Sequence, residues 1–156
     1  MATNVHANAV QLLRARHEAK FDGSGGLRPG FAVKYPNSPD FVQPDNAPWS
    51  DWRPMWAHAT QLTANAAGGE RRIGTLIEDI NVPRLNGELL PAQIGDDICV
   101  VWRPDTPDLP YVIPSGAGYR FRFFPTTVTE VGIARDDNAW FRCTAVTPLW
   151  YDYVPS

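Results

Sequence analysis

Residues 71–83 read RRIGTLIEDINVP and residues 140–150 read WFRCTAVTPLW. Both stretches contain or begin with arginine and are otherwise rich in apolar and β-branched residues, which is typical of β-strands. Between them, apolar residues recur at helical spacing: Leu90, Ile94, Ile98 and Val101. Two strands that bracket one amphipathic helix predict an α+β domain. We expect a mainly antiparallel β-sheet with two α-helices packed on one face.

The first helix is expected over residues 4–20, where an apolar stripe is followed by a glycine-rich stop at 23–26. The second helix is expected over residues 90–103. Further strands are expected over residues 31–35, 49–63, 119–124, 126–134 and 139–151, with Asp136-Asp137-Asn138 as the hairpin turn before the last one. The expected core contains Ile94, Ile98, Val101, Phe121, Phe141 and Cys143.

Two strands carry irregular features. Pro54 cannot donate a hydrogen bond to a neighbouring strand, so the strand over 49–63 should lie at a sheet edge or contain a bulge there. In the strand over 71–82, the apolar positions shift phase between Ile77 and Ile80. Such a shift predicts a bulge or burial of both faces.

The chain has 156 residues, enough for one domain with a hydrophobic core, which we place over residues 1–156. A formal net charge of −3 gives no overall attraction to nucleic acid or anionic lipid. No apolar run approaches the roughly 18 residues of a membrane span, and no leader is recognised, so we expect no membrane partner and folding in a reducing cytoplasm. Cys99 and Cys143 are interpreted as small buried apolar residues without a disulfide.

The residues that could carry chemistry are scattered. His6, His17 and His58 lack the paired spacing of a metal site. The acidic pairs at 96–97 and 136–137 are better explained as a solvated helix face and a turn than as acid–base catalysts. The glycine-rich segments lack the following lysine of a phosphate-binding loop. We therefore expect no catalytic, metal or cofactor-binding residues, and no enzyme activity.

Two binding functions were also considered. Arg120 and Arg122 alternate with Phe121 and Phe123. This pattern favours an ordinary strand with one buried face over a surface for single-stranded nucleic acid. The six tryptophans could stack on sugar rings in a carbohydrate-binding module, but tryptophan is also enriched at protein interfaces.

Several short segments together resemble a known family. They are NAPW at 46–49, GGERRIG at 68–74, INVP at 80–83, the helix after it, YRFRF at 119–123 and WFRCTAV at 140–146. In this order and spacing they resemble the tail-terminator, or tail-completion, proteins of long-tailed bacteriophages. Each motif is short, and the resemblance covers most of the chain.

The resemblance implies a subunit that assembles with copies of itself into a hexameric ring on the finished tail tube. Its implied partners are the major tail tube protein and a head–neck connector protein, with DNA only as cargo passing through the ring lumen. It implies a location in the virion, at the neck-proximal end of the tail, after assembly in the host cytoplasm. It also implies no cofactor and no catalytic residue.

The segment from Pro104 to Gly118 is longer than expected for that family and becomes a candidate contact surface. Protein-interface residues are expected at Pro107, Leu109, Tyr111 and Ile113 in this segment, and at Trp56, Arg71 and Arg72 elsewhere. Two alternatives stay open. One is a head–tail adaptor or stopper of the phage neck, and the other is a small carbohydrate-binding module, which should stay monomeric and respond to sugars.

Overall fold

The computed structural model describes residues 5–61, 69–87, 89–103, 111–112, 118–134 and 137–153, with backbone only at 58–61, 111–112, 131–134 and 137–139. It confirms an α+β fold. In chain order the elements are α1 (Val5–His17), the π-helical turn η1 (Glu18–Asp22), β1 (Ala32–Lys34), β2 (Trp49–Gln61), β3 (Glu70–Pro83), the 3₁₀ turn η2 (Arg84–Asn86), α2 (Leu89–Val101), β4 (Tyr111–Val112), β5 (Tyr119–Phe123), β6 (Thr127–Ala134) and β7 (Asp137–Tyr153).

The described strands form one seven-stranded sheet in the order β1-β2-β3-β7-β5-β4, with β6 also paired to β7. Only β1 and β2 run parallel, and every other described pair is antiparallel. β7 is the centre of the sheet. One edge of β7 pairs with β3 along its length, while the other edge pairs first with β6 and then with β5.

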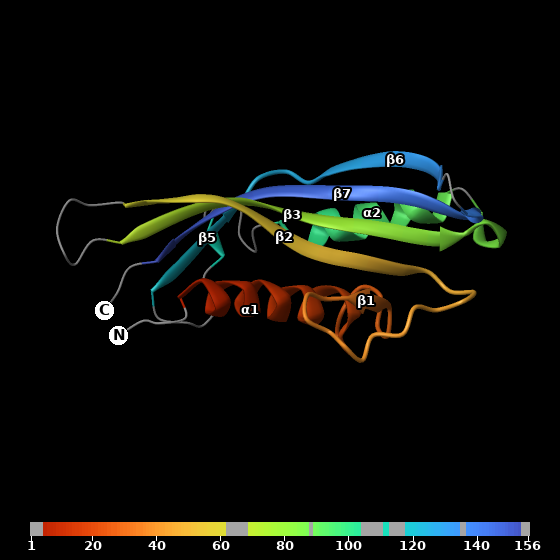
Figure 1. The fold of residues 1–156 in the computed structure, drawn as a ribbon, viewed down its shortest axis with the longest axis horizontal. Coiled ribbons are helices and arrows are strands. Elements are labelled where there is room, and N and C mark those ends of the chain that lie inside the picture. The colour runs from red at the N-terminus through yellow and green to blue at the C-terminus, as the bar shows by residue number, and fades with distance from the viewer. Residues whose placement is uncertain are drawn as a thin grey trace.

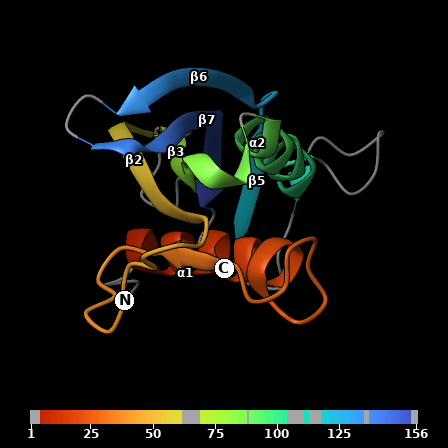
Figure 2. The ribbon, with the colours of Figure 1, turned by 90° about the vertical axis from the view of Figure 1, so that its right-hand side faces the viewer.

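Both helices cover the same face of this sheet, as expected. Figure 1 shows α1 running along the strands beneath the sheet, with α2 beside β3 and β7. Viewed down the long axis, the sheet curls from β6 through β7 and β3 to β2, with α2 within the curl and α1 below it (Figure 2). The opposite face of the sheet is covered by neither helix, and we call it the outer face.

The core lies between the helices and the inner face of the sheet. Alternation along the strands supplies large side chains from β2, β3, β5 and β7, and these meet the apolar stripes of α1 and α2. The expected core residues Ile94, Ile98, Val101, Phe121 and Cys143 are all buried. Phe141 is only half-buried, because it lies toward one end of the sheet with the Arg84 guanidinium over its ring.

Of the two explanations predicted for the phase shift in β3, a bulge is not found, whereas burial of both faces is confirmed at the end of the strand, where residues 80–83 are all buried. β3 pairs with β7 without interruption from Glu70 to Pro83. Its inward positions are the even-numbered residues Gly74, Leu76, Glu78, Ile80 and Val82, all of them buried. The alternation looked broken because one inward position is a glutamate and another a glycine.

Of the two forms of the expectation for Pro54, the unpaired sheet edge is confirmed, whereas β2 has no bulge at Pro54 itself, where its register with β3 is continuous. β1 pairs only with residues 49–51 of β2, so β2 has an unpaired edge at Pro54 among the described strands. A register shift also interrupts β2 between Trp56 and Ala59. The last hairpin differs from expectation: Asp137 and Asn138, which were predicted as turn residues, already belong to β7, and Asp137 pairs with Ala134.

The helix ends also differ slightly from the expected ones. α1 ends at His17 and continues as the π-helical turn η1 to Asp22, rather than ending as an α-helix at residue 20. α2 ends at Val101. On α2, Cys99 is half-buried rather than buried, and Asp97 does not simply face water, since it accepts a hydrogen bond from Arg28.

Candidate functional site

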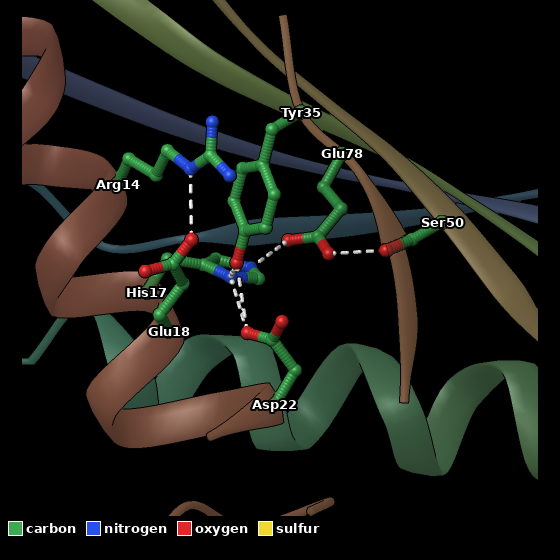
Figure 3. Close-up of polar contacts among 7 residues, drawn as sticks. All are labelled: Arg14, His17, Glu18, Asp22, Tyr35, Ser50 and Glu78. Carbon is green, nitrogen blue, oxygen red and sulfur yellow. Dashed lines mark hydrogen bonds and ion pairs between the residues drawn. The ribbon is translucent and has the colours of Figure 1, made fainter. Parts of the chain in front are cut away.

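The described residues contain two arrangements that could matter for function. One is a buried polar cluster under α1, and the other is the outer face of the sheet. The cluster joins five residues from different segments: His17, Asp22, Tyr35, Ser50 and Glu78 (Figure 3). The cluster was not recognised from the sequence, and of the outer face only Arg71 was predicted.

His17 is the centre of the cluster. It is the last residue of α1 and has no exposed surface. Its Nε2 lies 2.9 Å from Oε2 of Glu78, and its Nδ1 lies 2.7 Å from the Tyr35 hydroxyl. That hydroxyl donates in turn to Oδ1 of Asp22 at 2.8 Å. The π-helical turn contributes to this geometry, because it carries Asp22 back to within 3.4 Å of Nδ1 of His17.

The charges of the cluster are matched. Burial lowers the pKa of His17, but the facing carboxylates of Glu78 and Asp22 outweigh burial and raise this pKa from 6.5 to about 9. The imidazolium then donates from both ring nitrogens, to Glu78 and to the Tyr35 oxygen. Burial, followed by the nearby Asp22 carboxylate, raises the pKa of the Tyr35 hydroxyl, so it remains a donor.

The remaining oxygen of Glu78 is satisfied by Ser50. The Ser50 hydroxyl donates to Oε1 of Glu78 at 2.6 Å, and both residues are buried. A serine nucleophile is activated when its hydroxyl contacts an imidazole that a carboxylate orients. Here the Ser50 hydroxyl contacts the carboxylate of Glu78 and not the imidazole of His17, so the three groups are not arranged as a catalytic triad. What the arrangement does physically is tie α1 and η1 to β2, to β3 and to Tyr35, the residue that follows β1, through charged hydrogen bonds.

The outer face of the sheet has an apolar centre. Ile73 lies beside Trp150, and two residues further along β3 the facing strands carry Met55 and Pro148. Met55 is 56% exposed and Ile73 is 51% exposed. Charged ladders flank this centre on both sides, so its pattern is that of a protein-contact surface with an apolar core and a polar rim.

The ladder at one end of the outer face is built on Arg71. Its guanidinium donates to both carboxylate oxygens of Asp152, at 2.7 and 2.9 Å, and lies 3.9 Å from the centre of the Trp150 ring. At the other end, Asp79 accepts from Arg53 at 2.8 Å and from the Thr144 hydroxyl at 2.8 Å. These planar, shared contacts hold the ladders in fixed positions.

The sequence-predicted interface residues fall in different places. Arg71 lies on the outer face. Trp56 and Arg72 lie on the inner face, where Trp56 packs against the core and Arg72 pairs in register with the buried Tyr151. For Tyr111 the structure gives only the backbone, which pairs with Arg122. The other three predicted residues, Pro107, Leu109 and Ile113, lie outside the described residues.

The structure also shows where the side chains lie that suggested nucleic-acid binding and carbohydrate binding. Arg120 and Arg122 point to the outer face while Phe121 and Phe123 are buried, as the alternation predicted. All six tryptophans are buried or half-buried, and the Trp150 ring is covered by Arg71. None of the six side chains is in the fully exposed class that a sugar-stacking ring would favour.

His17 and Glu78 were the residues that sequence reasoning missed. In the sequence they are 61 positions apart, and each alone looks like a surface residue. One feature of the sequence could have indicated the cluster. Glu78 lies between Leu76 and Ile80, at a position where the alternation of the strand predicts a buried side chain. In the described part of the chain, no group of three potential ligands is placed to hold a metal ion.

Comparison with known proteins adds evidence on the fold alone. No protein-family model matches the sequence, and no curated protein matches it. Ten chains of solved structures match. One of them superimposes with a TM-score of 0.62 at 17% sequence identity, over 94% of this chain and 97% of the other chain. At that identity the likeness shows a shared architecture that extends over essentially the whole of both chains.

Among the described helices, none has the length and apolar character needed to cross a membrane.

Proposed function

We propose that this protein is a structural protein of a bacteriophage virion, a tail terminator that caps the tail tube as a ring and presents the head-joining surface. The observation that supports this best is the uncovered outer face of the sheet. A single chain leaves Met55 and Ile73 more than half exposed there, within a frame of fixed ion pairs. Such a surface fits a protein that acts by contact with other proteins.

The sequence resemblance supplies the specific function. Its segments at 68–74, 80–83, 119–123 and 140–146 fall mainly on β3, β5 and β7, the strands at the centre of the sheet. The proposal thus rests on the elements that define the fold and not on a peripheral loop. The polar cluster has a supporting role, since it fixes α1 on the inner face and leaves the outer face to partners.

The main experiment removes the protein from the phage and examines the tails by electron microscopy. A terminator stops tube polymerisation, so its loss should give tails of uncontrolled length that do not join heads. Supplying the intact chain in trans should restore length and joining. Tails of normal length that fail to join heads would replace this function with that of a neck adaptor or stopper. Normal, head-joined tails would exclude both functions.

The free protein should be monomeric or weakly associated at low concentration. A subunit that acts only on a completed tube must not polymerise freely, and the tube tip raises the effective concentration by presenting many copies of one binding surface. Sedimentation analysis with and without isolated tail tubes tests this. Stable rings without tubes would contradict it, and tryptophan quenching by sugars would instead support a carbohydrate-binding module.

The segment from 104 to 118 can be tested separately. As a contact surface carrying Pro107, Leu109, Tyr111 and Ile113, it should be needed for assembly and not for folding. Deleting residues 105–115 should therefore leave the thermal transition in place but weaken ring formation on tubes. Unchanged ring formation would show that the segment is not a contact surface.

A further inference from the structure

A hollow of about 340 Å³ lies between α1 and β2, beside the polar cluster. One side of it is a face of α1 that includes Val10, Gln11 and Arg14. The rest of its lining includes Asn37, from the turn after β1, and Trp52 of β2. These three segments are separate in the sequence, so the hollow exists only in the folded chain. Because α1 covers the inner face of the sheet, the hollow is distinct from the outer face on which the proposed function rests.

Trp52 brings an unsatisfied hydrogen-bond donor to this hollow. The residue is fully buried, and its indole Nε1 has no acceptor in the part of the chain that the structure describes. Buried polar groups in proteins nearly always have a partner, because a donor that is removed from water without one costs free energy. A buried donor without an acceptor, on a residue that lines a hollow, indicates that a molecule bound there supplies the acceptor.

Arg14 supplies further donors at a fixed position. Its guanidinium lies over the Tyr35 ring, 4.4 Å from the ring centre (Figure 3). The same ring packs edge-on against Trp52, with 5.5 Å between the ring centres, so the two donor groups flank one side chain. The Nε of Arg14 donates to Glu18 at 2.8 Å, whereas its two terminal nitrogens have no acceptor among the described residues. The Tyr35 hydroxyl is held in the polar cluster, which fixes the ring between the two donors.

The chemistry of the lining defines the ligand. Indole and guanidinium groups can only donate hydrogen bonds, whereas the amides of Gln11 and Asn37 can donate or accept. No carboxylate is among the described residues that line the hollow. The matching ligand group is one that only accepts, and a deprotonated carboxylate is such a group. Val10 adds an apolar contact, and the volume is near the lower end of the range for small-molecule pockets, so the rest of the ligand is small and partly apolar.

We propose that this hollow binds a small carboxylate with a short apolar body. The carboxylate accepts hydrogen bonds from Nε1 of Trp52 and from the terminal nitrogens of Arg14, and the amides of Gln11 and Asn37 contact it from the sides. Glu18 competes for the same guanidinium. The side chains of Arg14 and Glu18 are 41% and 43% exposed, and an ion pair so open to water is weak. The bound carboxylate therefore adds to the contacts of Arg14 without having to displace a strong partner.

Proton–nitrogen NMR spectra of the indole groups test the site directly. The chain has six tryptophans, and each indole resonance is assigned by replacing one tryptophan with phenylalanine. If Trp52→Phe does not fold, the Trp52 resonance follows by elimination. The probe is sodium isovalerate, a short branched carboxylate, compared with sodium chloride at equal ionic strength. Isovalerate should shift the Trp52 resonance saturably. A Trp52 resonance that stays in place up to the highest soluble concentration would overturn the proposal, since the donor is then satisfied by water and not by a carboxylate.

Two tryptophans on the same strand are matched controls. The Nε1 atoms of Trp49 and Trp56 are also buried and have no acceptor in the described part of the chain, but neither residue lines this hollow. Their resonances should stay in place, and equal shifts of all three would reject the site as a general solvent effect. Isovaleramide has the same shape with a neutral head group and should bind at least roughly tenfold more weakly. Equal binding of the amide would reject a carboxylate as the ligand group.

Substitutions at the guanidinium give the second test. Arg14→Gln should weaken isovalerate binding roughly tenfold or more, because a charged hydrogen bond is lost. Arg53→Gln is the matched control, since the Arg53 side chain is 42% exposed and also pairs with a carboxylate, but lies outside the hollow. It should leave binding unchanged. Glu18→Gln removes the competitor and should strengthen binding. Binding that is insensitive to Arg14→Gln, or that weakens in Glu18→Gln, would contradict the proposed contacts.

Asn37 allows one side chain of the site to be removed without backbone strain. Its φ is 57°, in the left-handed region that glycine adopts readily. Asn37→Gly should therefore keep the thermal transition but weaken isovalerate binding, and unchanged binding would remove Asn37 from the site. The carboxylate site and the terminator function are independent and fail separately. Binding is measured on the free protein, whereas the terminator function is judged from the tails of phage that lack it.

Discussion

Raising the pH from neutral to alkaline should weaken this fold by removing the proton that His17 holds between Glu78 and Tyr35. The pKa of His17 is raised in the folded protein, so its contribution to stability is complete below pH 6.5 and is lost as pH rises through about 9. That gap of about 2.5 pKa units, at about 1.36 kcal/mol each, corresponds to about 3 kcal/mol of unfolding free energy.

The assay is urea unfolding at a series of pH values from 6 to 10, followed by tryptophan fluorescence. The wild-type protein should lose stability across this range, and His17→Gln, which cannot be protonated, should start lower and lose much less. His6→Gln is the matched control: burial, then the charge of Arg72, lowers the pKa of His6, so any contribution it makes appears on acidification. If His17→Gln followed the same pH profile as the wild type, the charged cluster would not contribute as described.

The double substitution of the pair separates its charge from its packing. Removing only the histidine, as in His17→Leu, leaves Glu78 buried without a positive partner and should cost about 3–5 kcal/mol. His17→Leu combined with Glu78→Leu removes both charges and should recover part of that loss. A double variant less stable than His17→Leu alone would show that the carboxylate is satisfied without the histidine.

Three further substitutions test the packing, each by the shift in urea midpoint at constant slope. Ile98→Ala removes buried apolar volume from α2 and should cost about 2–5 kcal/mol; a loss below 1 kcal/mol would contradict its burial. Gly74→Ala places a methyl group against the Trp56 ring and should cost about 1–3 kcal/mol; it would be tolerated only if Trp56 does not pack there. Gly95→Ala meets Val128 at 2.7 Å and should destabilise despite its better helix propensity; a gain in stability would show that β6 moves freely away from α2.

The main elements of the fold could be predicted because their signals are local. The stripe of Ile94, Ile98 and Val101 follows helical spacing, and the alternation over 119–123 marks its own buried face. The unpaired edge of β2 at Pro54 is one of the two arrangements that the proline alone predicted. In each case neighbouring residues determine the structure, so no knowledge of distant contacts is needed.

The polar cluster could not be predicted, because its cause is not local. Glu78 is buried with a partner because α1 places His17 against it, and no spacing in the sequence indicates this contact. The same glutamate made the apolar pattern of β3 look displaced. The parallel pairing of β1 with β2 was also unforeseen, since 14 residues of irregular chain separate these strands.

The place of β7 in the sheet bears on how the chain folds during synthesis. β7 is the last described strand to leave the ribosome, yet β3, β5 and β6 all pair with it. Until residues 137–153 emerge, the nascent β3 has one bare edge and the two later strands have no common partner. The β1-β2-β3 part of the sheet can therefore join β5 and β6 only after this region is translated, and such late, long-range pairing favours slow folding. During that interval the unpaired edge of β3 is the kind of strand edge on which other chains can pair.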